Sequence, residues 1–337
     1  MKNKILSFIC FYLTVPLFVL SVMIFGGAVI GSVGRAAHAN EPNLDNEYGE
    51  FFEKGLFPAD MLDEIIELPD TMHPIIAKTI SSESNILNET TYKINEAEIL
   101  EHAPIFEYSS SSPLVLVIHT HATECYFEEN EETKIYYSQS DYAIEGYYDE
   151  NKTPTRTQDK EKNVVKVGEA FCDTLKSKGV ASIHCTELFD SEDYTVAYTN
   201  SGNAVKEYLE EYPSIKLVID IHRDSLISEE KVKVKTVADK LSSRPAQVMI
   251  VAGSDAGGLT YPDWKRSLAL DLEIKEVMDS RYPSLARPIF LRASRYNQHL
   301  AYTSLLLEVG TCANTLSEAK SAAQKAAECV AEVILGS

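Results

Sequence analysis

Apolar segments of strand length alternate with amphipathic segments of helix length from about residue 111 to the end of the chain. The strand candidates, all rich in Val, Ile or Leu, are residues 114–118, 180–186, 216–221, 246–252 and 304–309. The helix candidates are residues 163–178, 197–211, 264–279 and 317–335. Nearly continuous apolar strands separated by helices predict an α/β fold, an αβα sandwich with a mostly parallel central sheet.

The N-terminus carries a much longer apolar run, from Ile5 to about Val33, with Lys2 and Lys4 before it and Arg35 after it. A run of this length spans the roughly 30 Å of a bilayer core as a helix. The flanking lysines predict a cytoplasmic tip, so residues 1–35 would be a single-pass anchor in the cell membrane and the rest extracytoplasmic. A cleavable signal peptide is the alternative, because residues 37–39 (Ala-His-Ala) resemble a cleavage site.

Residues 36–110 are acidic and carry no chemical motif, so we expect an extracytoplasmic stalk or accessory region, with a short helix at residues 60–68. The turn-rich segment at residues 109–113 marks the entry to a catalytic domain at residues 111–337. Within that domain, residues 127–159 are polar and rich in tyrosine. They predict a long loop beside the functional site.

Charge and cysteine content narrow the function classes. A net charge of −20 disfavours nucleic acid as a partner, because binding phosphates needs clustered Lys and Arg. The five cysteines beyond the anchor match no zinc-ribbon or disulfide spacing, so we expect small buried side chains. They are Cys125, Cys172, Cys185, Cys312 and Cys329.

Metal-binding residue types follow two of the predicted strands. His121 and Glu124 come just after residues 114–118, and His222 ends the strand at 216–221. Sites in open α/β sheets form at the carboxyl ends of strands, and two His with one Glu are the ligands of an open catalytic Zn²⁺ site. His119 is an alternative ligand, because alternation in an extended segment places it on the same side as His121. The spacing to Glu124 favours His121, with His119 as support or substrate contact.

A hydrolytic zinc site also needs a base, and Glu308 is the candidate because it is an acid inside an apolar strand. Gly310 permits a sharp turn that would expose Glu308 to the cleft. The alternative is a carboxylate that turns to solvent or pairs with an arginine. Arg223 is expected to polarise the scissile carbonyl or to bind a substrate carboxylate. Asp224 is expected to fix the tautomer of a ligand histidine, and a structural ion pair is the alternative for both.

Arg295 and Asn297 add polar groups shortly before the last strand, where they would line a peptide-binding groove or lie in a solvated loop. His184, inside a predicted strand, is expected to be a core or edge histidine. Other chemistries lack their motifs: no Gly-rich phosphate loop with Lys-Ser/Thr and no G-x-S-x-G nucleophile elbow occurs.

Several coupled motifs resemble the stage II sporulation protein P family, in the same order and from about residue 113 to the C-terminus. They are residues 119–126, 162–168, 218–224, 295–298 and 307–310. Two positions depart from the expected pattern: Cys125 stands where a small residue is usual, and His299 where an acid is usual.

The resemblance implies a peptidoglycan hydrolase of endospore-forming bacteria that acts during engulfment of the forespore. It implies cleavage of the amide between N-acetylmuramic acid and L-alanine, an association with cutting peptide cross-links, and the stage II sporulation proteins D and M as partners. The implied fold is that of zinc amidases and zinc carboxypeptidases. The implied roles are zinc ligation by His121, Glu124 and His222, and catalysis by Glu308. A zinc peptidase acting only on stem peptides and a non-catalytic wall-binding scaffold are the rival functions.

Overall fold

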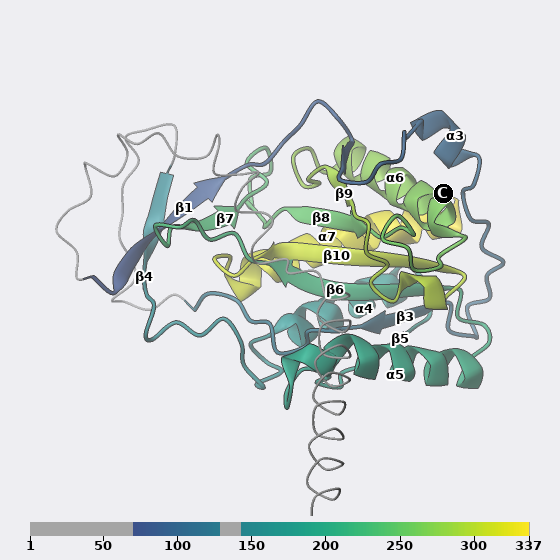
Figure 1. The fold of residues 1–337 in the computed structure, drawn as a ribbon, viewed down its shortest axis with the longest axis horizontal. Coiled ribbons are helices and arrows are strands. Elements are labelled where there is room, and N and C mark those ends of the chain that lie inside the picture. The colour runs from purple at the N-terminus through teal and green to yellow at the C-terminus, as the bar shows by residue number, and fades with distance from the viewer. Residues whose placement is uncertain (1–69, 129–142, 337) are drawn as a thin grey trace, which may run out of the picture. The chain divides into compact units, whose positions relative to one another are not determined.

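A seven-stranded mixed sheet forms the centre of the chain in the computed structural model, which describes residues 70–128 and 143–336 (Figure 1). Its strands, in spatial order, are β2 (Ile86–Asn88), β9 (Ile289–Leu291), β8 (Val248–Ala252), β10 (Thr303–Thr311), β6 (Leu217–Asp224), β3 (Val115–Ile118) and β5 (Ser182–His184). Every neighbouring pair is parallel except β10 with β8. The mostly parallel central sheet is therefore confirmed.

Helices cover both faces of this sheet. Three of them share one hydrophobic core with alternate strand residues such as Val115 and Val117: α4 (Val164–Ser177), α6 (Trp264–Arg281) and α7 (Leu316–Leu335). Helix α5 (Ala197–Glu211) packs on the opposite face, where Val205 meets Leu116 and Ile118. The 3-10 helices η2 (Tyr194–Val196) and η3 (Gln298–Leu300) make close approaches to α5. Because side chains alternate along β3, one strand serves both cores.

Capping side chains define where two of these helices begin. The Asn163 side chain accepts from the N–H of Val165 at the start of α4. At the start of α7, Thr315 and Glu318 form a reciprocal capping box. Each cap of this kind contributes about 1 kcal/mol.

A second sheet of three strands lies beside the first and has the order β4, β1, β7 (Figure 1). Its strands are β1 (Met72–Lys78), β4 (Ala143–Asp149) and β7 (Lys233–Thr236). Strand β4 lies in the segment expected to be a long loop, so that expectation is corrected: pairing with β1 supplies hydrogen bonds that periodicity did not reveal. Residues 70–110 supply β1, β2 and α3 (Glu96–Leu100). They therefore belong to the same folded unit as residues 111–337.

The five strands and four helices expected after residue 111 are confirmed, with ends that shift by a few residues. The expected anchor at residues 1–35 and the short helix at 60–68 lie outside the described residues. Among the helices that the structure describes, none is long and apolar enough to cross a membrane. The five cysteines beyond residue 35 are free, and four of them are buried.

Candidate active site at the carboxyl ends of three strands

The candidate residues meet on the α5 face of the main sheet, where β3, β6 and β10 end. Parallel pairing places Glu308 of β10 beside His222 of β6, and Ile118 of β3 beside Asp220. Asp220 and His222 continue the row of Val218, which packs in the α5 core, so their side chains emerge on that face. The sheet register therefore brings together residues far apart in the sequence.

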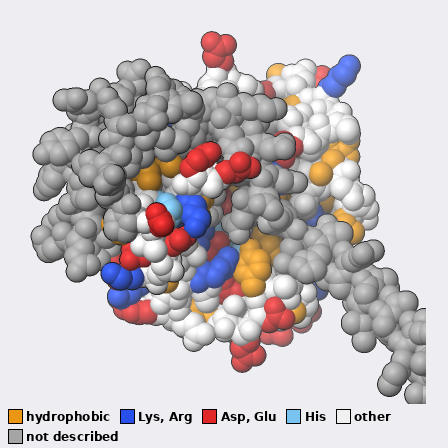
Figure 2. Space-filling view, turned by 60° about the vertical axis from the view of Figure 1, so that its left-hand side comes forward, with side chains coloured by type: hydrophobic (Ala, Val, Ile, Leu, Met, Phe, Trp, Pro, Cys, Tyr) orange, Lys and Arg blue, Asp and Glu red, His pale blue; other side chains and the backbone are white. Residues whose placement is uncertain are grey.

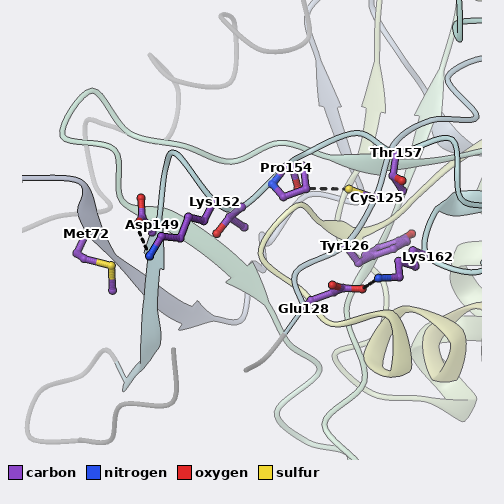
Figure 3. A pocket seen from close by; sticks show the side chains of 10 residues that line it. Met72, Cys125, Tyr126, Glu128, Asp149, Lys152, Pro154, Thr157 and Lys162 are labelled. Atoms are coloured by element: carbon purple, nitrogen blue, oxygen red, sulfur yellow. Dashed lines mark hydrogen bonds and ion pairs between the residues drawn. The ribbon is translucent and has the colours of Figure 1, made fainter. Parts of the chain in front are cut away.

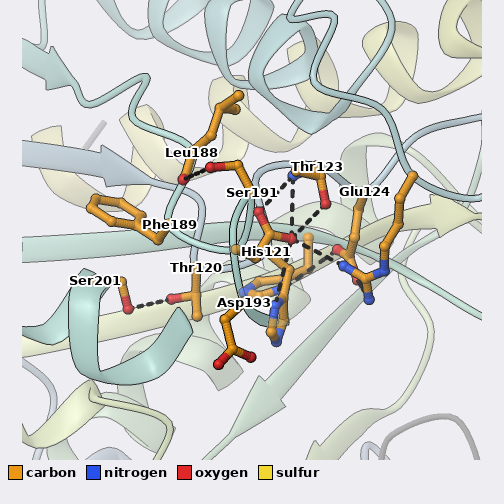
Figure 4. Close-up of polar contacts among 12 residues, drawn as sticks. Thr120, His121, Thr123, Glu124, Leu188, Phe189, Ser191, Asp193 and Ser201 are labelled. Atoms are coloured by element: carbon orange, nitrogen blue, oxygen red, sulfur yellow. Dashed lines mark hydrogen bonds and ion pairs between the residues drawn. The ribbon is translucent and has the colours of Figure 1, made fainter. Parts of the chain in front are cut away.

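The turn after β3 is held in place by two buried aspartates, which accept hydrogen bonds from Thr120 and Thr123; Figure 4 labels these two threonines. Thr120 donates from its backbone N–H and its hydroxyl to Asp220, at 2.8 and 2.6 Å. Thr123 donates in the same two ways to Asp190, at 3.1 and 2.6 Å. These charge-assisted hydrogen bonds fix the loop that carries His121.

Glu124 is a buried carboxylate surrounded by positive charge. One oxygen accepts from the backbone N–H of Arg223 at 3.2 Å and lies 3.5 Å from Nδ1 of His222. The other lies 3.7 Å from the Arg223 guanidinium and 4.0 Å from that of Arg156. Burial alone would raise the pKa of Glu124, but Arg223 and then His222 outweigh burial and hold the pKa well below its usual range. Glu124 is therefore ionised.

His222 lies between two carboxylates. Its Nε2 is 3.0 Å from Oδ1 of Asp220, although that contact lacks hydrogen-bond geometry. Burial disfavours the charged ring, but Asp220 and Glu124 outweigh burial and raise the pKa of His222 well above 6.5. The site thus favours a positive charge at this position.

His121 faces α5 and η2. Its ring stacks on Tyr194 at 4.2 Å between centroids and lies 5.5 Å from the His222 ring. Its Nδ1 is buried, has no hydrogen-bond partner, and lies 3.8 Å from Oδ2 of Asp190. Burial lowers the pKa of His121 to about 3, against the smaller opposing effect of Glu124. The ring is therefore neutral.

Glu308 is 3% exposed, and its Oε2 has no hydrogen-bond partner within the described chain. Burial, helped by Asp224 and Glu124 and opposed by His222, raises the pKa of Glu308 to about 8. The nearby Gly310 has φ +71°, and the pairing of β10 with β6 shifts between Glu308 and Thr311. The chain therefore departs from a regular strand directly after Glu308.

The other candidate residues have defined protein partners. Arg223 donates to the carbonyls of Cys125 and Thr155, at 3.2 and 2.8 Å, so its guanidinium supports the loop that carries Glu124. Asp224 accepts from Arg287 at 2.6 Å and from the Ser225 N–H at 2.7 Å. The aspartate beside His222 is therefore Asp220 and not Asp224.

Arg295 and Asn297, which lie between β9 and η3, form hydrogen bonds with a loop and a helix elsewhere in the fold. Arg295 donates to the carbonyl of Thr260 at 2.9 Å. Asn297, with φ +60°, donates to the carbonyl of Tyr198 at 2.6 Å, and the Tyr198 ring lies edge-on to His121 at 5.5 Å. The structure thus connects Asn297 to the site through Tyr198, and Arg295 to a different loop.

His119 lies on the opposite face of the sheet from His121. Its Nδ1 is 2.9 Å from the carbonyl oxygen of Ile221, and its Nε2 is 2.9 Å from Nε2 of His184. The expectation that alternation places both histidines on one side is wrong, because β3 ends at Ile118 and a turn begins at Thr120. Burial lowers the pKa of His119 to about 3 and that of His184 to about 4.

Three residues of the site were not predicted from the sequence: Asp220, Asp190 and Arg156. Asp220 stands two positions before His222 in one strand, and that spacing is a usable signal. Arg156 forms an ion pair with Asp190 at 3.0 Å and lies over the Tyr194 ring at 4.3 Å. Arg156 and Asp190 come from segments without a motif, so no sequence signal connects them.

A cavity of about 230 Å³ lies beside Cys125 and Tyr126, the residues that follow Glu124 (Figure 3). Charged pairs stand at its two ends: Asp149 with Lys152 at 3.5 Å, and Glu128 with Lys162 at 2.6 Å. The remaining lining residues are Met72, Thr153, Pro154 and Thr157. Figure 2 shows acidic and basic side chains gathered around a histidine on one face of the protein.

The cluster contains the residue types that bind zinc, although no three His, Cys, Asp or Glu side chains in the described ranges surround one point as metal ligands. Two imidazoles and a carboxylate are the ligands of open zinc sites. Nδ1 of His121 and Oε2 of Glu308 are buried without a hydrogen-bond partner, and Nδ1 of His222 faces Glu124 at 3.5 Å. Buried polar atoms are normally paired, so the two unpaired atoms are consistent with a site that takes up a further group.

Fold and site together define a mixed α/β protein with a buried histidine–carboxylate cluster at the carboxyl ends of parallel strands. The chain belongs to the stage II sporulation protein P family, whose sequence model matches residues 69–334. Stage II sporulation protein P of Bacillus subtilis (strain 168) is 26% identical over 258 residues. The match covers 73% of this chain and 57% of that protein, so the chain corresponds to little more than half of its relative.

The solved structures to which the chain is similar include two described as N-acetylmuramoyl-L-alanine amidases. AmiC2 of Nostoc punctiforme has 12% identity and a TM-score of 0.35, over 66% of this chain and 96% of that one. The amidase from Clostridium difficile 630 has 11% identity and a TM-score of 0.35, over 67% of this chain and 96% of that one.

Proposed function

We propose that this chain is a zinc-dependent N-acetylmuramoyl-L-alanine amidase that hydrolyses peptidoglycan in sporulating cells, during engulfment of the forespore. The observation that carries the proposal is Glu308, a buried carboxyl without a hydrogen-bond partner for Oε2, placed beside His222 by the sheet register. An acid kept in this state near a metal-binding residue set suits proton transfer better than structural support.

His121, Glu124 and His222 would hold the zinc ion. When bound, zinc polarises the scissile carbonyl and makes water a better nucleophile near neutral pH. The charge of Asp220, 3.0 Å from Nε2 of His222, would orient that ring, and the Arg223 N–H would orient Glu124. Because the Arg223 guanidinium is bonded to backbone carbonyls, we assign it to holding Glu124 and not to the substrate carbonyl.

Glu308 would move the proton. With a pKa raised to about 8, its carboxyl group holds a proton more readily than an ordinary glutamate. Only the ionised carboxylate can accept a proton, so in this form Oε2 would take the proton of the attacking water, and the resulting acid would deliver it to the nitrogen of the leaving L-alanine. The surrounding burial keeps bulk water from competing for that proton.

The test uses the purified full chain and purified peptidoglycan, with mass analysis of the released products. We expect free stem peptides that begin with L-alanine, and a loss of roughly 10²–10⁴-fold in rate for Glu308→Gln. Glu230→Gln, at an exposed glutamate, is the matched control. Full activity of Glu308→Gln would refute the assignment, and unchanged activity after complete zinc removal would refute the zinc requirement.

A peptidase acting on stem peptides is the second candidate, because the cavity beside Cys125 has charged pairs at both ends. Stem peptides carry both amines and carboxylates, which such a cavity can bind. The same mass analysis separates the two reactions: an amidase leaves glycan without peptide, whereas a peptidase leaves glycan with shortened peptides.

The family relationship also supports a cellular setting. We propose that residues 1–35 anchor the chain in the cell membrane with the catalytic domain outside, and that stage II sporulation proteins D and M are partners. Extraction from membranes by detergent but not by high salt is expected. Release by salt alone, or failure to co-purify with either partner from sporulating cells, would count against this setting.

A further inference from the structure

Two histidines outside the proposed ligand set form a buried pair behind the site. His119 is 0% exposed, and its ring nitrogens lie 2.9 Å from the carbonyl oxygen of Ile221 and 2.9 Å from Nε2 of His184. The pair lies among three adjacent strands, since His184 is in β5, His119 directly follows β3, and Ile221 is in β6 (Figure 1).

The contacts determine which nitrogen carries each proton. A carbonyl oxygen can only accept, so Nδ1 of His119 must carry a hydrogen. His119 is fully buried, and neither ring lies within hydrogen-bond distance of a carboxylate in the described ranges, so no partner there stabilises a charged ring. A neutral ring protonated on Nδ1 has a lone pair on Nε2, so Nε2 of His184 must donate to it.

This chain of hydrogen bonds runs from His184 through His119, two residues from one proposed zinc ligand, to Ile221, one residue from another. Ile221 directly precedes His222, and His119 is two residues before His121. We propose that His184 and His119 are positioning residues, which hold the ends of β3 and β6 at the separation that His121 and His222 need to share one zinc ion. The zinc part of this inference rests on the proposed function.

Gly168 of α4 makes room for the pair. A Cβ atom there would lie 2.4 Å from Nε2 of His119 and 2.7 Å from Nε2 of His184, closer than real contacts allow. Any side chain at this position would therefore push the two rings apart. Gly168→Ala is a way to break the pair without removing either histidine.

The first test determines the tautomers in the full chain with 15N-labelled histidines, by the imidazole nitrogen shifts. His119 is assigned by comparison with His119→Asn. We expect His119 to be protonated on Nδ1 only and His184 to be protonated on Nε2. His119 protonated on Nε2 would overturn the inference, and this readout does not depend on zinc or activity.

The second test measures zinc affinity by competition with a chromophoric chelator. His184→Leu, which cannot donate, is expected to weaken zinc binding roughly 10–100-fold, as does loss of other groups that orient metal ligands. His184→Gln, which can donate from its amide, should restore most of that loss, and Gly168→Ala should weaken binding. His102→Gln, at an exposed histidine, is the matched control.

The outcomes separate this inference from the proposed function. If the wild-type chain binds zinc and His184→Leu binds it equally well, the positioning role is refuted while the amidase proposal stands. If the wild-type chain binds no zinc, the proposed zinc site fails and the positioning role fails with it, whereas the tautomers are still tested. If His184→Leu loses zinc affinity and His184→Gln does not restore it, the hydrogen-bond role of His184 is also refuted. If His184→Leu does not fold, the Gln and Gly168→Ala variants decide the question.

Discussion

The buried carboxyl of Asp271 makes a sharp prediction about stability. Asp271 lies in α6, is 1% exposed, and neither of its oxygens has a hydrogen-bond partner in the described chain. Leu268 and Ile274 of the same helix belong to the main core. Burial raises the pKa of Asp271 well above 3.8, so the folded protein keeps it protonated at pH values where the unfolded chain does not.

The different protonation of Asp271 in the folded and unfolded states determines how the free energy of unfolding changes with pH. Well below pH 3.8 both states are protonated, so ionisation of Asp271 makes no difference to stability. As the pH rises, the unfolded chain is favoured by about 1.4 kcal/mol per pH unit, until the folded carboxyl also ionises. Asp271→Asn has nearly the same shape and does not titrate. Its stability relative to wild type should therefore increase as the pH rises from 5 to 7, with an upper limit of about 2.7 kcal/mol for one proton over two pH units.

Denaturant unfolding at pH 5, 6 and 7 measures this difference. The single tryptophan, Trp264, is buried in the first turn of α6, so its fluorescence reports on the same helix. Asp239→Asn, at an exposed aspartate, provides the matched control. An amide without a partner has its own cost of about 1–3 kcal/mol, but that cost does not vary with pH. A stability difference that stays constant from pH 5 to pH 7 would refute the reasoning.

Three further predictions follow from single contacts. Asp220→Asn removes the charge beside His222 and should weaken zinc binding roughly 10–100-fold in a chelator competition; unchanged affinity would contradict its orienting role. Gly310→Ala forces a side chain into a backbone with φ +71° close behind Glu308. This variant should lower the free energy of unfolding by roughly 1–3 kcal/mol, measured with denaturant, and should also lower activity. A denaturation midpoint equal to that of the wild type would argue against backbone strain at residue 310. Thr315→Ala breaks the capping box of α7 and should cost about 1 kcal/mol, a loss that Thr315→Ser should largely avoid.

Long periodic elements could be predicted from the sequence because each forms its pattern locally. Strand β6 and helix α7 carry enough consecutive apolar positions to define their type and approximate ends. Strands β2 and β9 are three residues long, and β4 lies in a polar segment, so none carries a readable period. They exist because a partner strand supplies hydrogen bonds, and that partner is distant in the sequence.

The residues of the candidate site also fall into two groups, those that could be predicted from the sequence and those that could not. Glu308 and His222 could be found because each stands at a strand end, and the register of neighbouring parallel strands brings strand ends together. Arg156 and Asp190 could not be found, since they reach Glu124 and His121 through loops. Loop paths depend on tertiary contacts, such as the bonds from Thr123 to Asp190, and not on a repeating pattern.

His119 and His121 show where the alternation of side chains between the two faces of the sheet ends. Val115, Val117 and His119 form one row toward α4, and the row holds because β3 is extended up to Ile118. At Thr120 the backbone turns, and its hydroxyl bonds to Asp220 and Ser201 on the α5 side. His121 therefore reaches the opposite face, although it stands only two residues beyond His119. The turn that breaks the alternation is what allows one short motif to contribute both a proposed ligand and the residue that positions the next strand.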